Sequence, residues 1–341
     1  MIKILLLLIL ISSSCFAQSG VALDSWSRFD NFEKDFQNLI FESANVIFVE
    51  SNYGDDSNSG LKYTQPKQTI SSALSVAGNS DTVKVLCAGT FEESFEVQSG
   101  VTLYAPLATI EGAINMRGDS RVYIKKHFAH ADSATMLNKM DAEHGYYRTI
   151  NSFSNGYNNV TNIRNATNNS ILFADITYMI TTGRGVQDFT ADTTPIGGHI
   201  HVNIRDLYMI GSSVRAIDAA NSSSDIIGKI DHIKKMESEG AKIAIQVDGG
   251  KVDLMLAEID VGDDTAYYVG ESGKLTLNCL RIVGVKTVEE GGIIRLPMLA
   301  DGSNALATDT RTNISVYSKA EIDGLIGDID NALAEIIEGE I

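Results

Sequence analysis

The sequence Val202-Asn-Ile204-Arg-Asp-Leu207 sets a pattern (apolar, any, apolar, any, any, apolar) that decides the fold. The same pattern recurs as Ile171-Leu-Phe173-Ala-Asp-Ile176, Gly228-Lys-Ile230-Asp-His-Ile233, Leu254-Met-Leu256-Ala-Glu-Ile259 and Leu275-Thr-Leu277-Asn-Cys-Leu280. Aligned on the second apolar position, the copies lie 31, 26, 26 and 21 residues apart. Each copy is typical of two short strands joined by a two-residue bend. One copy cannot bury its own apolar side chains, whereas stacked copies share a continuous core.

Weaker copies lie on both sides of this region. They are Val83-Lys-Val85, Val101-Thr-Leu103, Val122-Tyr-Ile124 and Ile294-Arg-Leu296. An interval of 49 residues separates Ile124 from Phe173, so residues 128–168 contain either a degenerate coil or an inserted loop. A β-sandwich is the alternative fold, but hairpin turns of the Asn-Gly kind are nearly absent between these strands. The periodicity therefore predicts an all-β parallel solenoid over residues 48–300.

The segment that precedes the first strands adds a resemblance to a known family. It reads Phe48-Val-Glu-Ser-Asn-Tyr-Gly-Asp-Asp-Ser-Asn-Ser-Gly60, then Pro66, Thr69-Ile70, Ala73, Gly78, Asp81-Thr-Val83 and Ala88-Gly-Thr90. This segment resembles the opening of right-handed parallel β-helix domains of the pectin-lyase-like superfamily. The resemblance covers residues 48–110 and implies an N-terminal cap followed by the first coils. It implies the fold and not a lyase activity. Within the segment, residues 69–77 are expected to form a helix.

The N-terminus predicts export. Lys3 precedes an unbroken apolar run over residues 4–11, and Cys15-Phe16-Ala17 places small residues where signal peptidase cleaves. We expect residues 1–17 to be a removable signal peptide. The apolar run is shorter than the ~20 residues that a membrane-spanning helix needs, so no membrane span is expected after its removal. Residues 18–47 are expected to be a helical segment, because their apolar residues recur at three- and four-residue intervals.

The C-terminus predicts self-association. Residues 316–337 resemble a short segment that recurs in bacteriophage tail fibre proteins. Ser318 and Glu321 form a capping box, and a seam at heptad-like spacing follows it: Ile322, Leu325, Ile329 and Ile336. We expect residues 301–341 to be a linker and an oligomerising helix that forms a homotrimer. The alternative is an amphipathic helix that covers the last coil.

Charge and cysteine content limit the partners. The formal net charge is −17, which disfavours nucleic acid and anionic membrane surfaces, because both require basic side chains. Cys87 and Cys279, which remain after signal removal, lie in apolar runs typical of buried thiols. No disulfide framework or zinc spacing is predicted.

One column of the aligned repeats contains titratable residues. The second residue of each bend is Asp175, Asp206, His232 or Glu258 in successive copies. Stacked carboxylates and an imidazole are suited to acid and base catalysis or to cation binding. The alternative is a solvated ladder, because bends in solenoids are polar by default. These four residues are the weak catalytic candidates, and the catalytic assignment stays open.

Two further candidates are weaker. Because strand residues alternate between faces, His199, His201, Asn203 and Arg205 are expected to form an outward polar stripe that contacts a ligand. The loop residues Asp55, Asp56 and Asn58 offer oxygen ligands for a calcium ion, or serve as turn residues. No other metal or cofactor is predicted.

Three functional classes remain. The first is a phage tail fibre or receptor-binding protein in the virion tail, a β-helix shaft that contacts host-surface polysaccharide. The second is a secreted β-helix polysaccharide lyase or hydrolase. The third is a secreted carbohydrate-binding module without catalysis. The C-terminal resemblance favours the first class, and the signal peptide favours the other two.

Overall fold

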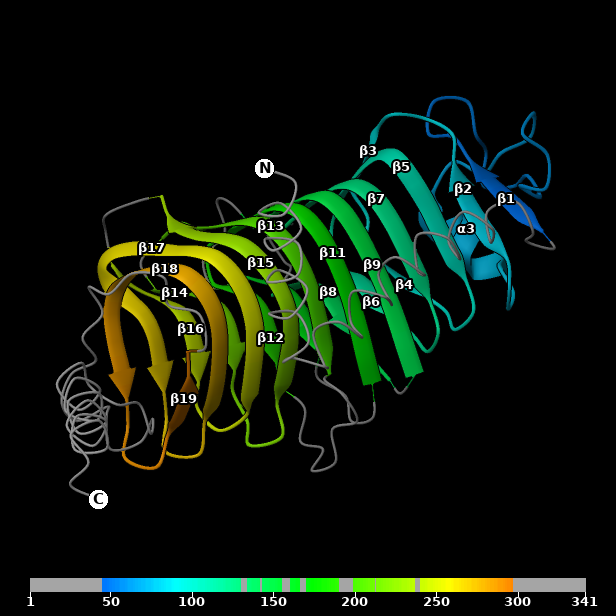
Figure 1. Ribbon diagram of the computed structural model, residues 1–341. Helices are drawn as coiled ribbons and strands as arrows, with labels where there is room; N and C mark the ends of the chain where they lie inside the picture. The colour runs from blue at the N-terminus through cyan, green and yellow to red at the C-terminus, as the bar shows by residue number, and fades with distance from the viewer. Residues whose placement is uncertain are drawn as a thin grey trace, which may run out of the picture.

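The strands form one continuous parallel sheet that winds into an elongated β-helix (Figure 1). The structure is a computed structural model and describes residues 45–129, 134–141, 143–154, 160–165, 170–189, 199–211, 213–236 and 240–296. Every pairing between its named strands is parallel. The predicted parallel solenoid is therefore confirmed.

The coils contain long and short strands. The long strands are β5 (Thr102–Glu111), β7 (Arg121–Phe128), β9 (Glu143–Phe153), β11 (Ser170–Thr181), β13 (Ile200–Met209), β15 (Asp225–Lys235), β17 (Lys251–Val269) and β18 (Lys274–Val288). The short strands are β4 (Phe95–Val97), β6 (Ile114–Met116), β8 (Thr135–Lys139), β10 (Thr161–Asn165), β12 (Arg184–Asp188), β14 (Ser213–Ala219) and β16 (Ala241–Val247). Each strand pairs with the equivalent strand of the next coil, and β17 and β18 continue from the long-strand part into the short-strand part.

Inward-facing apolar rows form the core. One row runs Leu103, Val122, Tyr147, Ala174, Val202, Gly228, Leu254 and Leu277 in successive coils. The apolar side chains in this row are no more than 1 % exposed. Successive strand residues point to opposite faces, so the apolar positions of the repeat lie inside and the polar positions outside.

A short helix lies at the N-terminal end of the solenoid. Helix α3 (Ile70–Val76) packs against β1 (Val46–Val49), β2 (Thr82–Val85) and β4. The Thr69 hydroxyl accepts a hydrogen bond from the Ser72 amide (3.1 Å), and the Glu93 carboxylate accepts from the Ile70 and Ser71 amides (2.9 and 2.8 Å). These acceptors satisfy amides that lack partners within the helix. The predicted helix over residues 69–77 is confirmed.

The interval between residues 128 and 168 contains a coil. Strands β8, β9 and β10 lie in it, and Tyr146 of β9 pairs with Arg121 on one side and with Phe173 on the other. The remaining strands are β3 (Thr90–Phe91) and β19 (Ile293–Arg295). Strand β1 begins at Val46, so the last two residues of the predicted helical segment 18–47 form strand instead.

The terminal predictions lie outside the described residues. These are the signal peptide at residues 1–17, the rest of the N-terminal helical segment, and the linker and oligomerising helix at residues 301–341. In the part of the chain that the structure describes, no helix combines the length and hydropathy of a membrane span.

Candidate functional site

The structure brings three of the four catalytic candidates into one outward row. Asp206 pairs with His232, and His232 pairs with Glu258. The row continues to Tyr178 on one side and to Arg281 on the other. Neighbouring members lie one strand spacing apart, about 4.8 Å.

Asp175 does not belong to this row, so its predicted position there is wrong. Ile176, and not Phe173, pairs with Ile204, which shortens the interval between these coils from 31 to 28 residues. Asp175 lies in the neighbouring row, where it accepts hydrogen bonds from Arg148 Nε (3.1 Å) and Asn203 Nδ2 (3.0 Å). The repeat pattern matches both registers, because Phe173 and Ile176 are both apolar.

Basic side chains and His232 contact the carboxylates of the Asp206 row. His232 Nδ1 lies 2.8 Å from Asp206 Oδ1, and Arg205 Nε lies 3.0 Å from Asp206 Oδ2. Lys234 Nζ lies 2.7 Å from Glu258 Oε2, and Arg281 bonds to the other oxygen of Glu258. Hydrogen bonds from Lys234 and Arg281 keep the pKa of the Glu258 carboxyl below its usual value, despite partial burial. Glu258 is therefore ionised at neutral pH and is poorly suited to act as a general acid.

The predicted polar stripe of His199, His201, Asn203 and Arg205 is not a single exposed surface. His199 and His201 are only 3 % and 2 % exposed, so they do not form an accessible stripe with the other two. The His201 ring packs against Phe173, with 4.6 Å between ring centroids. Arg205 is exposed, and its guanidinium lies 4.2 Å from the centre of the Tyr178 ring. Alternation along a strand predicts which way a side chain points but not whether other residues bury it. The burial of the two histidines could therefore not be predicted from the sequence.

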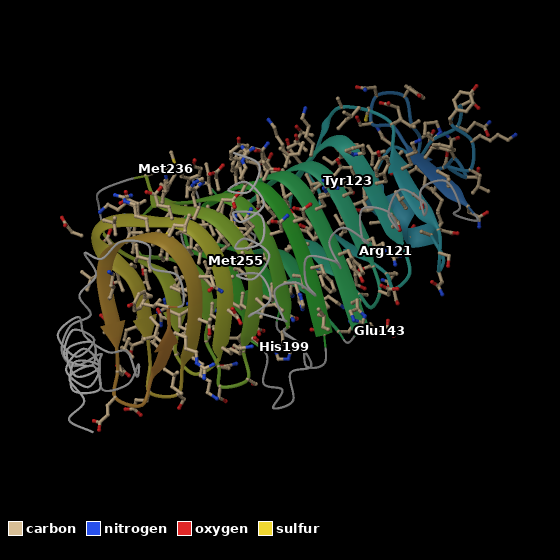
Figure 2. All side chains as sticks on the ribbon, in the orientation of Figure 1. Arg121, Tyr123, Glu143, His199, Met236 and Met255 are labelled. Carbon is tan, nitrogen blue, oxygen red and sulfur yellow. The ribbon has the colours of Figure 1, made fainter. Side chains whose placement is uncertain are left out.

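A buried polar network surrounds His199, which lies directly before β13 (Figure 2). His199 Nδ1 lies 3.0 Å from Asp188 Oδ2, and the same carboxylate oxygen accepts a hydrogen bond from the Asp225 amide (2.7 Å). Burial raises the pKa of the Asp225 carboxyl, and it likewise raises the pKa of the nearby Asp253 carboxyl. Carboxyl groups with a raised pKa beside a His–Asp pair are chemically suited to proton transfer. The repeat alignment offered no signal for this network, because its members come from the ends of strands.

Aromatic side chains on the long strands stack on one another. The rings of Tyr146 and Phe173 are parallel within 8°, with centroids 4.9 Å apart, and Phe128 meets Phe153 edge to face at 5.2 Å. Arg121 of β7 covers the Tyr146 ring at 5.5 Å (Figure 2 shows Arg121 on this strand). Contacts within the protein thus occupy much of these ring faces and support the coil stacking.

The calcium candidates make hydrogen bonds within the N-terminal loop. Asp55 Oδ1 accepts from the Ser57 amide (2.8 Å), and Asp56 Oδ1 accepts from the Gln68 and Thr69 amides (both 2.9 Å). Asn58 Nδ2 donates to the Pro66 carbonyl (2.9 Å). Among the described residues, no group of three or more His, Cys, Asp or Glu side chains has a metal-binding arrangement. Calcium binding at this loop stays a prediction.

The oligomerisation candidates Ile322, Leu325, Ile329 and Ile336 lie outside the described residues.

Comparison of the chain with protein-family profiles, curated proteins and solved structures returns no match. The structure itself defines the class of the protein as a parallel β-helix. Membership of the pectin-lyase-like superfamily and kinship with tail fibre proteins stay predictions.

Proposed function

We propose that the protein is a non-catalytic binding protein: a β-helix shaft of a phage tail fibre or receptor-binding component that contacts host-surface glycans. The observation that carries the non-catalytic part is the ion pairing of both Glu258 oxygens, with Lys234 and Arg281. These ion pairs are suited to stabilising stacked coils, and they leave Glu258 poorly suited to act as a general acid. The elongated fold supports a shaft, and the C-terminal sequence resemblance supports the virion location.

The test separates binding from cleavage. The mature chain is incubated with purified host envelope polysaccharide, and bound protein and newly formed sugar ends are both measured. We expect saturable binding and no increase in reducing or unsaturated ends. Mass spectrometry of purified virions tests the location. Cleavage would overturn the non-catalytic assignment, and absence from virions would favour a secreted carbohydrate-binding module.

A secreted polysaccharide lyase or hydrolase is the second candidate, and the Asp188–His199–Asp225 network favours it. Two carboxyls with a raised pKa, the buried Asp225 of this network and the partly buried Asp253 nearby, are the groups best suited to donate a proton. If cleavage is found, Asp225→Asn should abolish it, whereas Asp206→Asn combined with Glu258→Gln should leave it unchanged. The opposite result would assign the activity to the Asp206 row.

A further inference from the structure

The short strands carry a patch of arginine and other polar side chains. It consists of Arg164 on β10, Arg184 and Gln187 on β12, and Arg215 and Asp218 on β14, which we call the arginine patch. Arg184 pairs with Arg215, and Gln187 pairs with Arg164 on one side and Asp218 on the other. Arg164, Gln187 and Asp218 each follow a buried core residue (Ile163, Val186 and Ile217) and so point away from the core. Arg184 and Arg215 reach the surface, since their side chains are partly exposed.

The arginine patch is positively charged in a strongly acidic protein. Asp218 is fully buried, and its Oδ2 lies 2.8 Å from Arg184 Nε, 3.1 Å from Gln187 Nε2 and 3.5 Å from Arg215 NH1. The patch thus combines three guanidinium groups with one carboxylate, a formal charge of about +2. The side chains of Arg184 and Arg215 are each 36 % exposed, so they are accessible to a ligand. Guanidinium groups bind carboxylate, sulfate and phosphate through paired hydrogen bonds.

Several polar atoms beneath this surface lack partners. Asn138 Oδ1, Arg164 Nε, Asp218 Oδ1 and Gln246 Oε1 are among the buried side-chain atoms of the described residues that have no hydrogen-bond partner. All four residues belong to a single outward row, which runs Asn138, Arg164, Gln187, Asp218 and Gln246 through successive coils. An unsatisfied buried polar group costs about 1–3 kcal/mol, so four in one row call for an explanation.

The accessible groups of the patch indicate the ligand chemistry. Guanidinium groups only donate hydrogen bonds, so the ligand must offer acceptors, as an acidic sugar does. Phe189 lies beside Arg164, 5.3 Å from the guanidinium to the ring centre, and its side chain is 44 % exposed. An exposed aromatic ring beside hydrogen-bonding groups also suits a sugar ring.

We propose that the arginine patch binds an anionic polysaccharide that lies along the solenoid axis and contacts several coils at once. The inference deepens the proposed function, and it rests on that function for the glycan nature of the ligand. Because the arginines belong to three successive coils, they span about 10 Å along the axis, a spacing that favours a polymer over a single sugar.

The test measures the affinity of the full mature chain for a panel of polymers by isothermal titration calorimetry. Polygalacturonate and dextran sulfate supply carboxylate and sulfate groups, dextran is the neutral control, and a single-stranded DNA oligonucleotide is the non-sugar polyanion. We expect at least one acidic polysaccharide to bind at least tenfold more tightly than dextran and DNA. Whichever of the two binds more tightly identifies the acidic group that the patch prefers.

Two substitutions with opposite expected effects locate the site. Arg164→Gln should weaken binding about tenfold, because it removes a charged donor that holds no ion pair in the described structure. Asp218→Asn should strengthen binding about threefold, because it removes the negative charge that competes for Arg184 and Arg215. Lys125→Gln, which removes an exposed charge on the long strands, is the matched control and should leave affinity unchanged.

If the patch only stabilised the fold, Asp218→Asn would not increase the affinity for polysaccharide. Circular dichroism confirms that each variant is folded before it is titrated. Equal binding of dextran, tighter binding of DNA, or equal losses in Arg164→Gln and Lys125→Gln would each overturn the proposal. Binding of neutral host glycans alone would also overturn it while leaving the proposed function intact. If binding depended on the patch but the protein were absent from virions, the patch proposal would stand and the proposed virion location would fall.

Discussion

At the scale of single residues, burial decides the chemistry of His127. Its side chain is fully buried on β7, with Nδ1 2.9 Å from the Tyr147 hydroxyl and Nε2 2.9 Å from the Gly112 carbonyl. A carbonyl can only accept, so Nε2 carries the proton and Nδ1 accepts from the tyrosine. Burial lowers the pKa of His127 to about 4. The folded protein therefore holds this imidazole neutral.

This pKa predicts a loss of stability in mild acid. The folded pKa lies below the ordinary value of 6.5, so the unfolded chain binds the proton first as the pH falls. Stability from neutral His127 is complete above pH 6.5 and is lost progressively towards pH 4. Between pH 7.5 and pH 5 the free energy of unfolding should fall by about 2 kcal/mol more than in His127→Gln. Urea titrations of both proteins at the two pH values measure the difference, and parallel pH profiles would contradict the prediction.

The partner of His127 gives a second prediction at this scale. Tyr147→Phe keeps the ring volume but removes the only donor that the described structure gives to His127 Nδ1. Leaving that buried nitrogen without a donor should cost about 1–3 kcal/mol of unfolding free energy. Tyr63→Phe, whose side chain is 67 % exposed, is the control and should change stability little. Equal urea midpoints for both variants would show that the buried hydrogen bond contributes nothing.

At the scale of strands, backbone contact between coils explains the one irregular repeat. Gly228 stands where other copies have an apolar residue, and it pairs with Val202 and Leu254. Its φ is +140°, and a Cβ at this position would lie 2.0 Å from the Val202 carbonyl oxygen. Glycine is therefore needed here, because a side chain would collide with the backbone of the neighbouring coil.

Gly228→Ala should destabilise the protein by about 2 kcal/mol or more, because backbone atoms must move to admit the methyl group. Gly78→Ala is the matched control, since its Cβ would meet only the Asp81 carboxylate, at an ordinary 3.6 Å. Thermal unfolding followed by circular dichroism compares the two. If Gly228→Ala were as stable as Gly78→Ala, the two coils would be able to move apart at residue 228 without a loss of unfolding free energy.

The ion-pair row predicts a smaller effect on the same strands. Glu258→Gln removes the charge between Lys234 and Arg281 and leaves two cations close together. Because the pair is partly exposed, the loss in unfolding free energy should be about 1 kcal/mol or less, and smaller still at high salt. A loss that does not respond to salt would show that packing, and not charge, holds the row together.

At the scale of the whole molecule, the coils stack into a long shaft whose ends need cover, because an open strand edge invites pairing with another chain. Helix α3 packs against β1, β2 and β4 near the N-terminal end. At the other end, β19 pairs with only the first three residues of β18. The predicted C-terminal helix follows that end in the sequence.

The predicted seam gives the test of assembly. Replacing Leu325 and Ile329 by Asp in the full mature chain should convert a trimer into a monomer while preserving the β-rich circular dichroism spectrum, because charges in an a/d seam oppose helix association. Light scattering measures the mass. An unchanged mass would remove the trimer hypothesis. A monomeric starting protein whose stability falls on substitution would favour the alternative of a helix that covers the last coil.

The sequence by itself determined the parallel β-helix, the capping helix α3 and the inward apolar rows, because local periodicity and capping residues encode these features within one coil. Which side chains of successive coils lie in the same row was decided by the tertiary structure. The intervals between coils vary, so Asp175 lies outside the predicted row. The burial of His199 and His201 is also evident only in the tertiary structure. The arginine patch joins Arg164, Arg184 and Arg215, which lie 20 and 31 residues apart. Only the hydrogen-bond register between coils brings such residues together, since no local pattern in the chain records which strand edges will meet.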